Sequence, residues 1–196
     1  MSKSYCLCLL PILAAGCAPK GPTGPSLPDI ATFKPDALFA PKAVLEYGGM
    51  KADVVMGRTQ TEAKVSFSLV AHGQTFETET YLLTANEFSF VSIDEVFEPP
   101  IVLFRSKMPI GEKWDWSGTL SSGGRSHVAK AQITTASEQL FLKNAGQQDT
   151  LKVQVDLSIE SGGPKPAARK LIFWFVNGRG IVQREVGTAT IRRPES

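Results

Sequence analysis

Alternating polar and apolar residues are the main pattern along this chain. The clearest example is 151–160, LKVQVDLSIE, where the odd positions are apolar and the even positions are polar. A period of two places one face of a strand on a core and the other face in water, which is typical of an antiparallel sheet. The run 65–69, VSFSL, has the same pattern. Both segments therefore predict half-buried β-strands.

Turn signals and one fully apolar segment complete this pattern. Glycine and polar residues follow the two strands at 71–74 and 161–164, as they do in hairpin turns. Residues 171–176, LIFWFV, are apolar throughout, which predicts a strand covered on both faces. No long amphipathic helix is found, and 92–97 is expected to form a turn or two of helix. The fold class is therefore all-β, or β-rich α+β, with a strongly curved antiparallel sheet or an open half-barrel.

A faint internal repeat predicts that this sheet contains two similar β units. Residues 45–49, LEYGG, and 114–118, WDWSG, share the order apolar, acidic, aromatic, small, glycine. Two further pairs of segments match in the same order, 57–59 with 124–126 and 81–86 with 173–178. This order predicts units of about 37–98 and 99–193, with the crossing between them at Glu98-Pro99-Pro100.

The N-terminus has the layout of a secretory signal peptide. A short basic start precedes an apolar run from Tyr5 to Ala15, and small residues then lead into Cys17. About eleven apolar residues would span ~16 Å as a helix, which is too short for a permanent transmembrane anchor. A cysteine at the cleavage point resembles the signal of bacterial lipoproteins, in which the thiol is acylated before cleavage. The resemblance implies that residues 1–16 are removed and that Cys17 is lipidated.

Cysteine usage favours lipidation over a plain cleaved signal with an incidental cysteine. Cys6 and Cys8 lie inside the signal, so cleavage leaves Cys17 as the only thiol and no disulfide can form within the mature chain. Ala14 departs from the lipoprotein pattern, which usually has leucine at that position. Ala18 stands where an inner-membrane retention signal usually has aspartate. The resemblance therefore implies an outer-membrane lipoprotein facing the periplasm in an organism with two membranes, and a cell-surface protein otherwise.

Residues 17–36 predict a tether between the lipid anchor and a single β domain at 37–196. Prolines alternate here with glycine and serine, and no apolar residue recurs before Ile30. Such a segment extends by ~3.1 Å per residue, so the domain could stand about 40–50 Å from the membrane. The preferred interpretation is a spacer without a binding role.

Composition and charge narrow the classes of partner. The chain has 21 basic and 19 acidic residues and no basic run. Phosphate binding needs clustered Lys and Arg, so nucleic acid is not an expected partner. A hydrophobic content of 42% excludes disorder as the general state. The expected partners are the membrane, through acyl chains on Cys17, and either a hydrophobic small molecule or an envelope protein.

Signals for nucleophilic or metal-dependent catalysis are weak. His72 and His127 sit in predicted hairpins beside glycine and polar residues, as solvated turn histidines do. With Cys17 lipidated and no His-x-x-x-His or Cys-x-x-Cys spacing, no metal or cofactor is expected. No Gly-x-Ser-x-Gly elbow occurs, and the glycine-rich segment 121–124 lacks the lysine and helix of a phosphate loop. That segment predicts a hairpin turn.

Glu77 and Glu79 are the acidic pair that could act as a glycosidase pair. Two residues apart on a strand, they share one face with their Cα atoms about 7 Å apart. Solvated strand acids are far more common, and solvated side chains are what we expect here. We therefore expect no catalytic residues and no enzyme activity, with an envelope hydrolase as the second alternative function.

The aromatic residues carry the sharpest functional hypothesis. Trp114 and Trp116 project from one strand face, as do Phe173 and Phe175, whereas Trp174 points the other way. One interpretation is core packing, since a large aromatic side chain buries about 150–250 Å². A second is a concave apolar groove for a lipid or another hydrophobic ligand, lined by the first four of these residues. A third is a protein-docking surface.

A family resemblance covers most of the predicted domain. Residues 98–116, EPPIVLFRSKMPIGEKWDW, contain prolines followed by Gly-x-x-Trp-x-aromatic, and 173–182, FWFVNGRGIV, form an aromatic run closed by a glycine turn and Gly-Ile-Val. These motifs resemble those of uncharacterised bacterial exported proteins and lipoproteins, and they imply no activity. A looser likeness, of fold alone, is to periplasmic lipoprotein carriers, whose open half-barrel shelters acyl chains.

The expected function is therefore that of a lipid-anchored cell-envelope protein, acting as a non-enzymatic binding or scaffold module. The alternative is a carrier of a lipid or another hydrophobic ligand in the aromatic groove.

Overall fold

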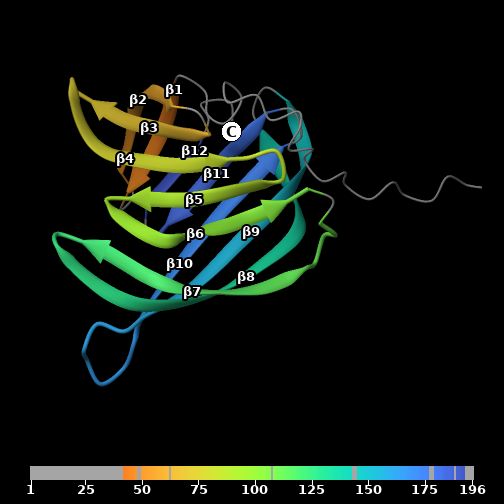
Figure 1. Cartoon of the computed structure of the whole chain (residues 1–196). Coiled ribbons are helices and arrows are strands. Elements are labelled where there is room, and N and C mark those ends of the chain that lie inside the picture. Colours follow the sequence, from red (N-terminus) through yellow and green to blue (C-terminus); the bar gives the residue numbers. More distant parts are fainter. Residues whose placement is uncertain are drawn as a thin grey trace, which may run out of the picture.

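The computed structural model describes residues 42–47, 50–61, 63–106, 108–142, 145–176, 179–187 and 189–192. The predicted signal peptide, Cys17 and the tether lie outside the described residues. Within them the chain forms twelve strands and no helix (Figure 1). The strands are β1 (Lys42–Tyr47), β2 (Met50–Thr61), β3 (Lys64–Ala71), β4 (Gln74–Leu83), β5 (Glu87–Ile93), β6 (Glu95–Arg105), β7 (Lys113–Ser122), β8 (Arg125–Leu142), β9 (Gly146–Ile159), β10 (Ala167–Val176), β11 (Gly180–Val186) and β12 (Ala189–Arg192). No helix in these residues has the length and apolar character needed to cross a membrane.

The sheet is an antiparallel meander that curls strongly on itself. Each strand pairs with its neighbours in sequence, and β1 pairs with β2 on one side and with β12 on the other. The described strands therefore follow the order of a closed barrel, with the curled sheet visible in Figure 1. The predicted all-β class, with a strongly curved sheet of the half-barrel kind, is confirmed. The pairing of β1 with β12, which joins the two edges of the sheet, is a further feature of the structure.

The meander gives the barrel two different ends. Turns after odd-numbered strands, such as His72-Gly73, Asp94 and Gly123-Gly124, lie at one end, which we call the hairpin end. Connections after even-numbered strands lie at the other, where β1 begins and β12 ends, and we call this the terminal end.

The interior of the barrel is packed with aromatic side chains. Tyr81 stacks on Phe88 with 5.2 Å between ring centroids, and Phe173 meets Phe90 edge-on at 5.5 Å. Phe175 meets Phe88 edge-on at 5.8 Å, and all five rings are fully buried. Edge-on and offset-stacked pairs of this kind are the favoured arrangements of aromatic rings. These rings belong to one continuous cluster of buried residues that lies inside the curled sheet.

The alternating pattern placed the main strands correctly. The segments 151–159 and 65–69 lie in β9 and β3, and their apolar residues point into the core. In β10 both faces are covered, as predicted. Trp174 points outward and joins a second, small cluster with Leu142, Val176 and Val182.

Three expectations, about local structure and the internal repeat, differ from the fold. Residues 92–97 form no helix: they are the end of β5, a turn at Asp94 with a φ of 52°, and the start of β6. Glu98-Pro99-Pro100 lies inside β6 and not in a crossing segment. The matched segments 57–59 and 124–126 also differ in setting, since the first lies within β2 and the second covers the turn and start of β8.

Candidate functional site

Trp114 and Trp116 of β7 bridge a break in the sheet between β6 and β7. These strands pair only over Val96–Glu98 and the facing residues of β7. Pro99 and the proline after it then interrupt the ladder, because proline has no N–H to donate. Beyond this point the indole Nε1 of Trp116 donates to the carbonyl oxygen of Pro99 at 2.9 Å, and that of Trp114 to Val102 at 3.2 Å. Side-chain hydrogen bonds thus replace backbone ones across the break.

Gly118 leaves the space that the indole ring of Trp116 occupies. A Cβ atom on Gly118 would lie 2.7 Å from Cζ2 of Trp116 and closer still to the carbonyl oxygen of Glu98. Only glycine therefore fits beneath the indole ring. Trp114 is less buried, and the guanidinium of Arg105 lies 5.9 Å from its ring centroid, a cation–π contact.

The four residues of the predicted ligand groove occupy two different settings. Phe173 and Phe175 are fully buried rings of the barrel core, which is the packing interpretation of these residues. Trp114 and Trp116 lie at the break, where Trp116 is 8% exposed and meets Phe97 edge-on at 6.1 Å. A ligand could reach the two phenylalanines only by displacing core side chains. A groove that includes the two tryptophans stays a prediction.

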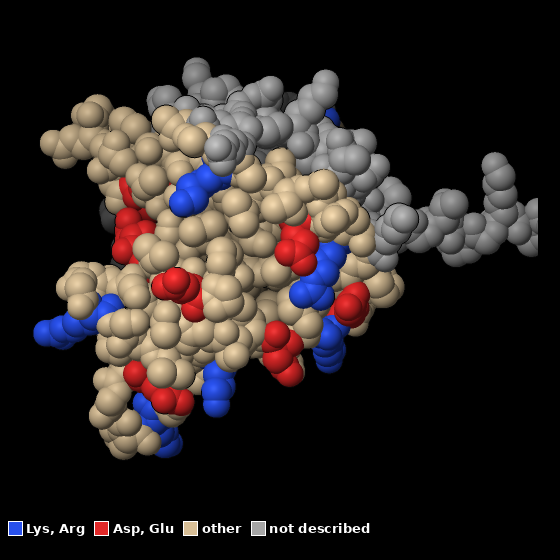
Figure 2. Space-filling model, viewed as in Figure 1, with Lys and Arg blue, Asp and Glu red and all other residues tan. Residues whose placement is uncertain are grey.

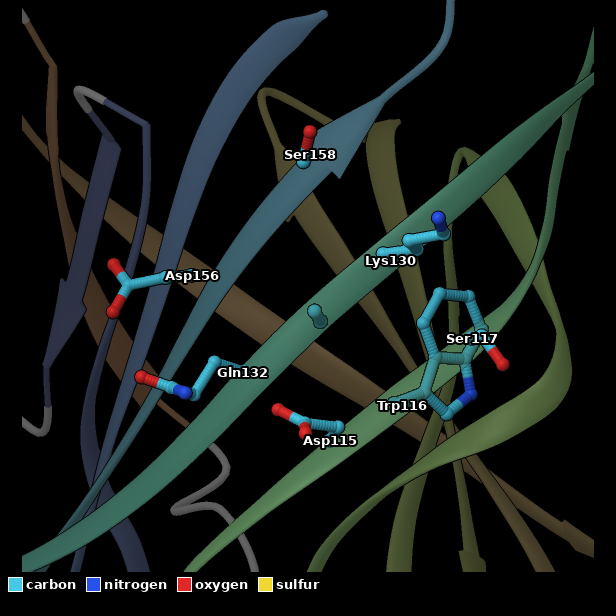
Figure 3. Close-up of a pocket in the computed structure, with 8 residues that line it drawn as sticks. Asp115, Trp116, Ser117, Lys130, Gln132, Asp156 and Ser158 are labelled. Atoms are coloured by element: carbon cyan, nitrogen blue, oxygen red, sulfur yellow. The ribbon is translucent and has the colours of Figure 1, made fainter.

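A hollow of about 390 Å³, with polar side chains along its walls, lies on the outer face of β7, β8 and β9 (Figure 3). Its exposed lining side chains form two rows in register across the three strands, Asp115, Gln132 and Asp156 in one and Ser117, Lys130 and Ser158 in the other. Trp116 also lines the hollow, so the hollow adjoins the break. Figure 2 shows basic and acidic side chains interspersed over the described surface that faces the viewer.

The carboxylates of Glu77 and Glu79 face the inside of the barrel, so the expectation of solvated acids is wrong. Nη2 of Arg184, on β11, forms ion pairs with both carboxylates. Arg184 and Glu79 are fully buried, and the hydroxyl of Tyr81 donates to Oε2 of Glu79 at 2.7 Å. Glu77, Glu79 and Tyr81 are spaced two residues apart on β4 and therefore share its inward face. This position explains the burial of the two acids.

Three side chains of this cluster have pKa values that differ from their ordinary values. Burial, with the nearby charges of Glu79 and Asp94, raises the pKa of Glu77 to about 7 although Arg184 opposes the shift. Burial and the Glu79 charge raise the pKa of Tyr81 well above its usual range, so it stays a hydrogen-bond donor. For Arg184, burial is outweighed by the two carboxylates, which raise its pKa. Its Nε and Nη1 atoms have no hydrogen-bond partner among the described residues.

A second pocket, of about 290 Å³, opens at the hairpin end and has Glu77 in its lining. Its other lining residues are Ile93, Asp94, Glu95, Ser122, Arg169 and Val186. Glu95 of β6 and Arg169 of β10 form an ion pair there, with Nη2 of Arg169 3.3 Å from Oε1 of Glu95. β6 and β10 are not neighbouring strands in the sheet, and neither are β4 and β11. Among the described residues, three ion pairs therefore cross the barrel at the hairpin end, two from Arg184 and one from Arg169.

The histidines lie apart from both pockets. His72 is in the β3–β4 turn with a φ of 52°, and His127 is near the start of β8. In the described parts of the chain, no group of three or more His, Cys, Asp or Glu side chains is placed to hold a metal ion.

Comparison with solved structures gives a structural likeness, and comparison of sequences gives none. No family model matches the chain, and no curated protein matches it. The chain is similar to the crystal structure of the hypothetical lipoprotein YmcC from Escherichia coli K12, with 14% sequence identity and a TM-score of 0.44. The match covers 84% of this chain and 88% of that chain. A likeness at this level carries no argument about function, and the proline and Gly-x-x-Trp motif stays a prediction.

Proposed function

We propose that this protein is a lipid-anchored envelope protein that acts as a non-enzymatic binding or scaffold module. In an organism with two membranes it would stand on the outer membrane and face the periplasm, held by acyl chains on Cys17. An envelope protein is the partner that we favour, and the hollow on β7–β9 is the surface that we assign to it.

The observation that carries this proposal is the packed interior of the barrel. A carrier needs internal space for its ligand, but here the described apolar side chains that point inward from β3 to β11 form a single aromatic-rich cluster. The hollow on β7–β9 instead lies outside, with exposed carboxylate, amide, ammonium and hydroxyl groups available for hydrogen bonding. Protein interfaces contain hydrogen bonds of the kind that these groups can form.

One observation favours the alternative of a hydrophobic-ligand carrier. The wall between β6 and β7 is completed by tryptophan side chains and not by backbone pairing. Rotation of Trp114 and Trp116 would open this wall next to the core. The experiment must therefore distinguish a bound lipid from a bound protein.

The anchor is tested with a Cys17→Ser variant of the full chain. We expect the wild type in the membrane fraction, with a mass that includes the acyl chains, and the variant in the soluble fraction. A wild-type protein without acyl mass would overturn the anchor proposal.

The partner surface is tested by placing a photo-crosslinking residue at Lys130, in the hollow, in the full lipidated chain. The control position is Lys64, which is exposed on β3. We expect a discrete protein adduct in the envelope from position 130 and none from position 64. Equal labelling at both positions would contradict the assigned surface, and a lipid seen by native mass spectrometry of the membrane-extracted protein would favour the carrier.

A further inference from the structure

We propose that Glu77, Glu79 and Arg184 form a proton-controlled latch that holds the hairpin end of the barrel closed and that loosens when Glu77 loses its proton. The latch is independent of the binding function proposed above. It lies on the inner face of the sheet, whereas the hollow on β7–β9 lies on the outer face.

The position of the cluster makes it a latch. Arg184 is on β11 and the two acids are on β4, and no hydrogen-bonded pairing joins these strands. Their side chains meet inside the barrel, so the ion pairs tie together walls that the sheet itself does not connect at this point. The Glu95–Arg169 pair, from β6 to β10, crosses the same end. Opening of the hairpin end must therefore break or rearrange these contacts.

The charges inside the latch do not balance when both acids are ionised. The charged and titratable side chains around Glu77 are Glu79 and Tyr81 on β4, Arg184 on β11, Asp94 in the β5–β6 turn, Glu95 on β6 and Arg169 on β10. Glu95 and Arg169 neutralise each other, and Tyr81 is neutral. Arg184 then balances only one of the two carboxylates of Glu77 and Glu79, and Asp94 places a further negative charge near Glu77. A proton on Glu77 removes one negative charge from this excess.

Glu77 is the member of the pair that exchanges its proton with solvent. Its side chain is 17% exposed and lines the 290 Å³ pocket, whereas the side chain of Glu79 is fully buried. Glu79 accepts the hydrogen bond from Tyr81, contacts Arg184 and does not line the pocket. The proton therefore enters from the pocket and resides on Glu77.

Linkage gives the direction and size of the effect. In the closed barrel the pKa of Glu77 is about 7, and in an opened, hydrated end it returns toward 4.5, the ordinary value. The proton then binds more tightly to the closed state, so the closed state loses its advantage as pH rises through this interval. A difference of this size corresponds to at most about 300-fold in the ratio of closed to open molecules.

Hydrogen exchange of the full chain tests the latch. Amide exchange of β4 and β11 is followed from pH 5 to pH 8 and corrected for the intrinsic pH dependence of exchange. We expect protection at these strands to fall by one to two orders of magnitude (about 10- to 100-fold) in the wild type. In Glu77→Gln, which keeps the neutral form, protection should be independent of pH. The control Glu87→Gln breaks an exposed ion pair with Arg105 at the terminal end and should behave as the wild type does.

The proposal is overturned if wild-type protection is independent of pH or if Glu77→Gln retains the wild-type dependence. Should Glu77→Gln fail to fold, titration of the Glu77 carboxyl carbon by NMR in the wild type decides the question. A midpoint near 7 supports the latch, and one near 4.5 overturns it.

Discussion

Arg184 of β11 reaches across the barrel to Glu79 of β4, and both side chains are completely removed from solvent. A buried ion pair of this kind contributes little net stability over an apolar pair, but removal of one partner leaves an uncompensated charge. We therefore expect Arg184→Met to lower the free energy of unfolding by about 3–5 kcal/mol, measured by urea denaturation at pH 7.

The matched control is Arg105→Met, which breaks the ion pair with Glu87 on the barrel surface, where both side chains are more than two-fifths exposed. Exposed pairs contribute about 0–1 kcal/mol. Equal losses of stability in the two variants would show that the Arg184 cluster is not an obligatory part of the core.

The stability of the wild type should fall as pH rises from about 4.5 to about 7 relative to Glu77→Gln. The sign follows from the raised pKa of Glu77, because a proton bound more tightly in the folded state stabilises that state below the pKa of the unfolded chain. The stabilisation is complete below about 4.5 and is lost as pH passes about 7. The full change is on the order of 3 kcal/mol. Denaturant titrations of both proteins at several pH values measure it, and a constant difference between them would contradict it.

The strands could be predicted from the sequence because alternation leaves a strong local signal. The apolar positions of β9 and β3 point to the core, as a period of two requires. The join between β1 and β12 could not be predicted, since it pairs segments at opposite ends of the domain and has no local signature.

The buried acids show where sequence reasoning stopped short. Glu77 and Glu79 were expected in solvent because acidic strand residues usually are. The available signal was their register, since both share a face with Tyr81, which is fully buried. Arg184 follows the apolar residues Ile181 and Val182 in the same strand, which is a corresponding indication that its side chain could be buried. What the sequence lacks is the information that these two strands meet across a barrel.

The sequence predicts the orientation of the two tryptophans but not their role in the structure. The prediction that Trp114 and Trp116 share one face is correct, but their role depends on how the prolines of the preceding strand, β6, interrupt its pairing with β7. The loss of the ladder after Glu98 creates the space that the indole rings occupy.

Gly118→Ala should destabilise the protein because the new methyl group would overlap Trp116 and the backbone of Glu98. Overpacking of this kind costs about 1–3 kcal/mol and more where backbone atoms must move. Gly163→Ala is the control, since its nearest neighbour is 3.7 Å away, in ordinary contact. Thermal unfolding followed by tryptophan fluorescence measures both variants. Similar melting temperatures for the two would contradict the tight packing at the break.

Phe173→Ala distinguishes core packing from a ligand groove. If Phe173 is part of the core, as its complete burial indicates, the variant should lose about 3–5 kcal/mol of unfolding free energy. If the ring instead lines a groove that opens to receive a hydrophobic ligand, its removal from the ligand-free protein would cost much less. Phe141→Ala is the control, because Phe141 is 73% exposed and its loss should change stability by less than about 0.5 kcal/mol. Urea denaturation of both variants, after removal of bound lipid, gives the comparison. A loss for Phe173→Ala as small as that for Phe141→Ala would favour the carrier alternative over the scaffold.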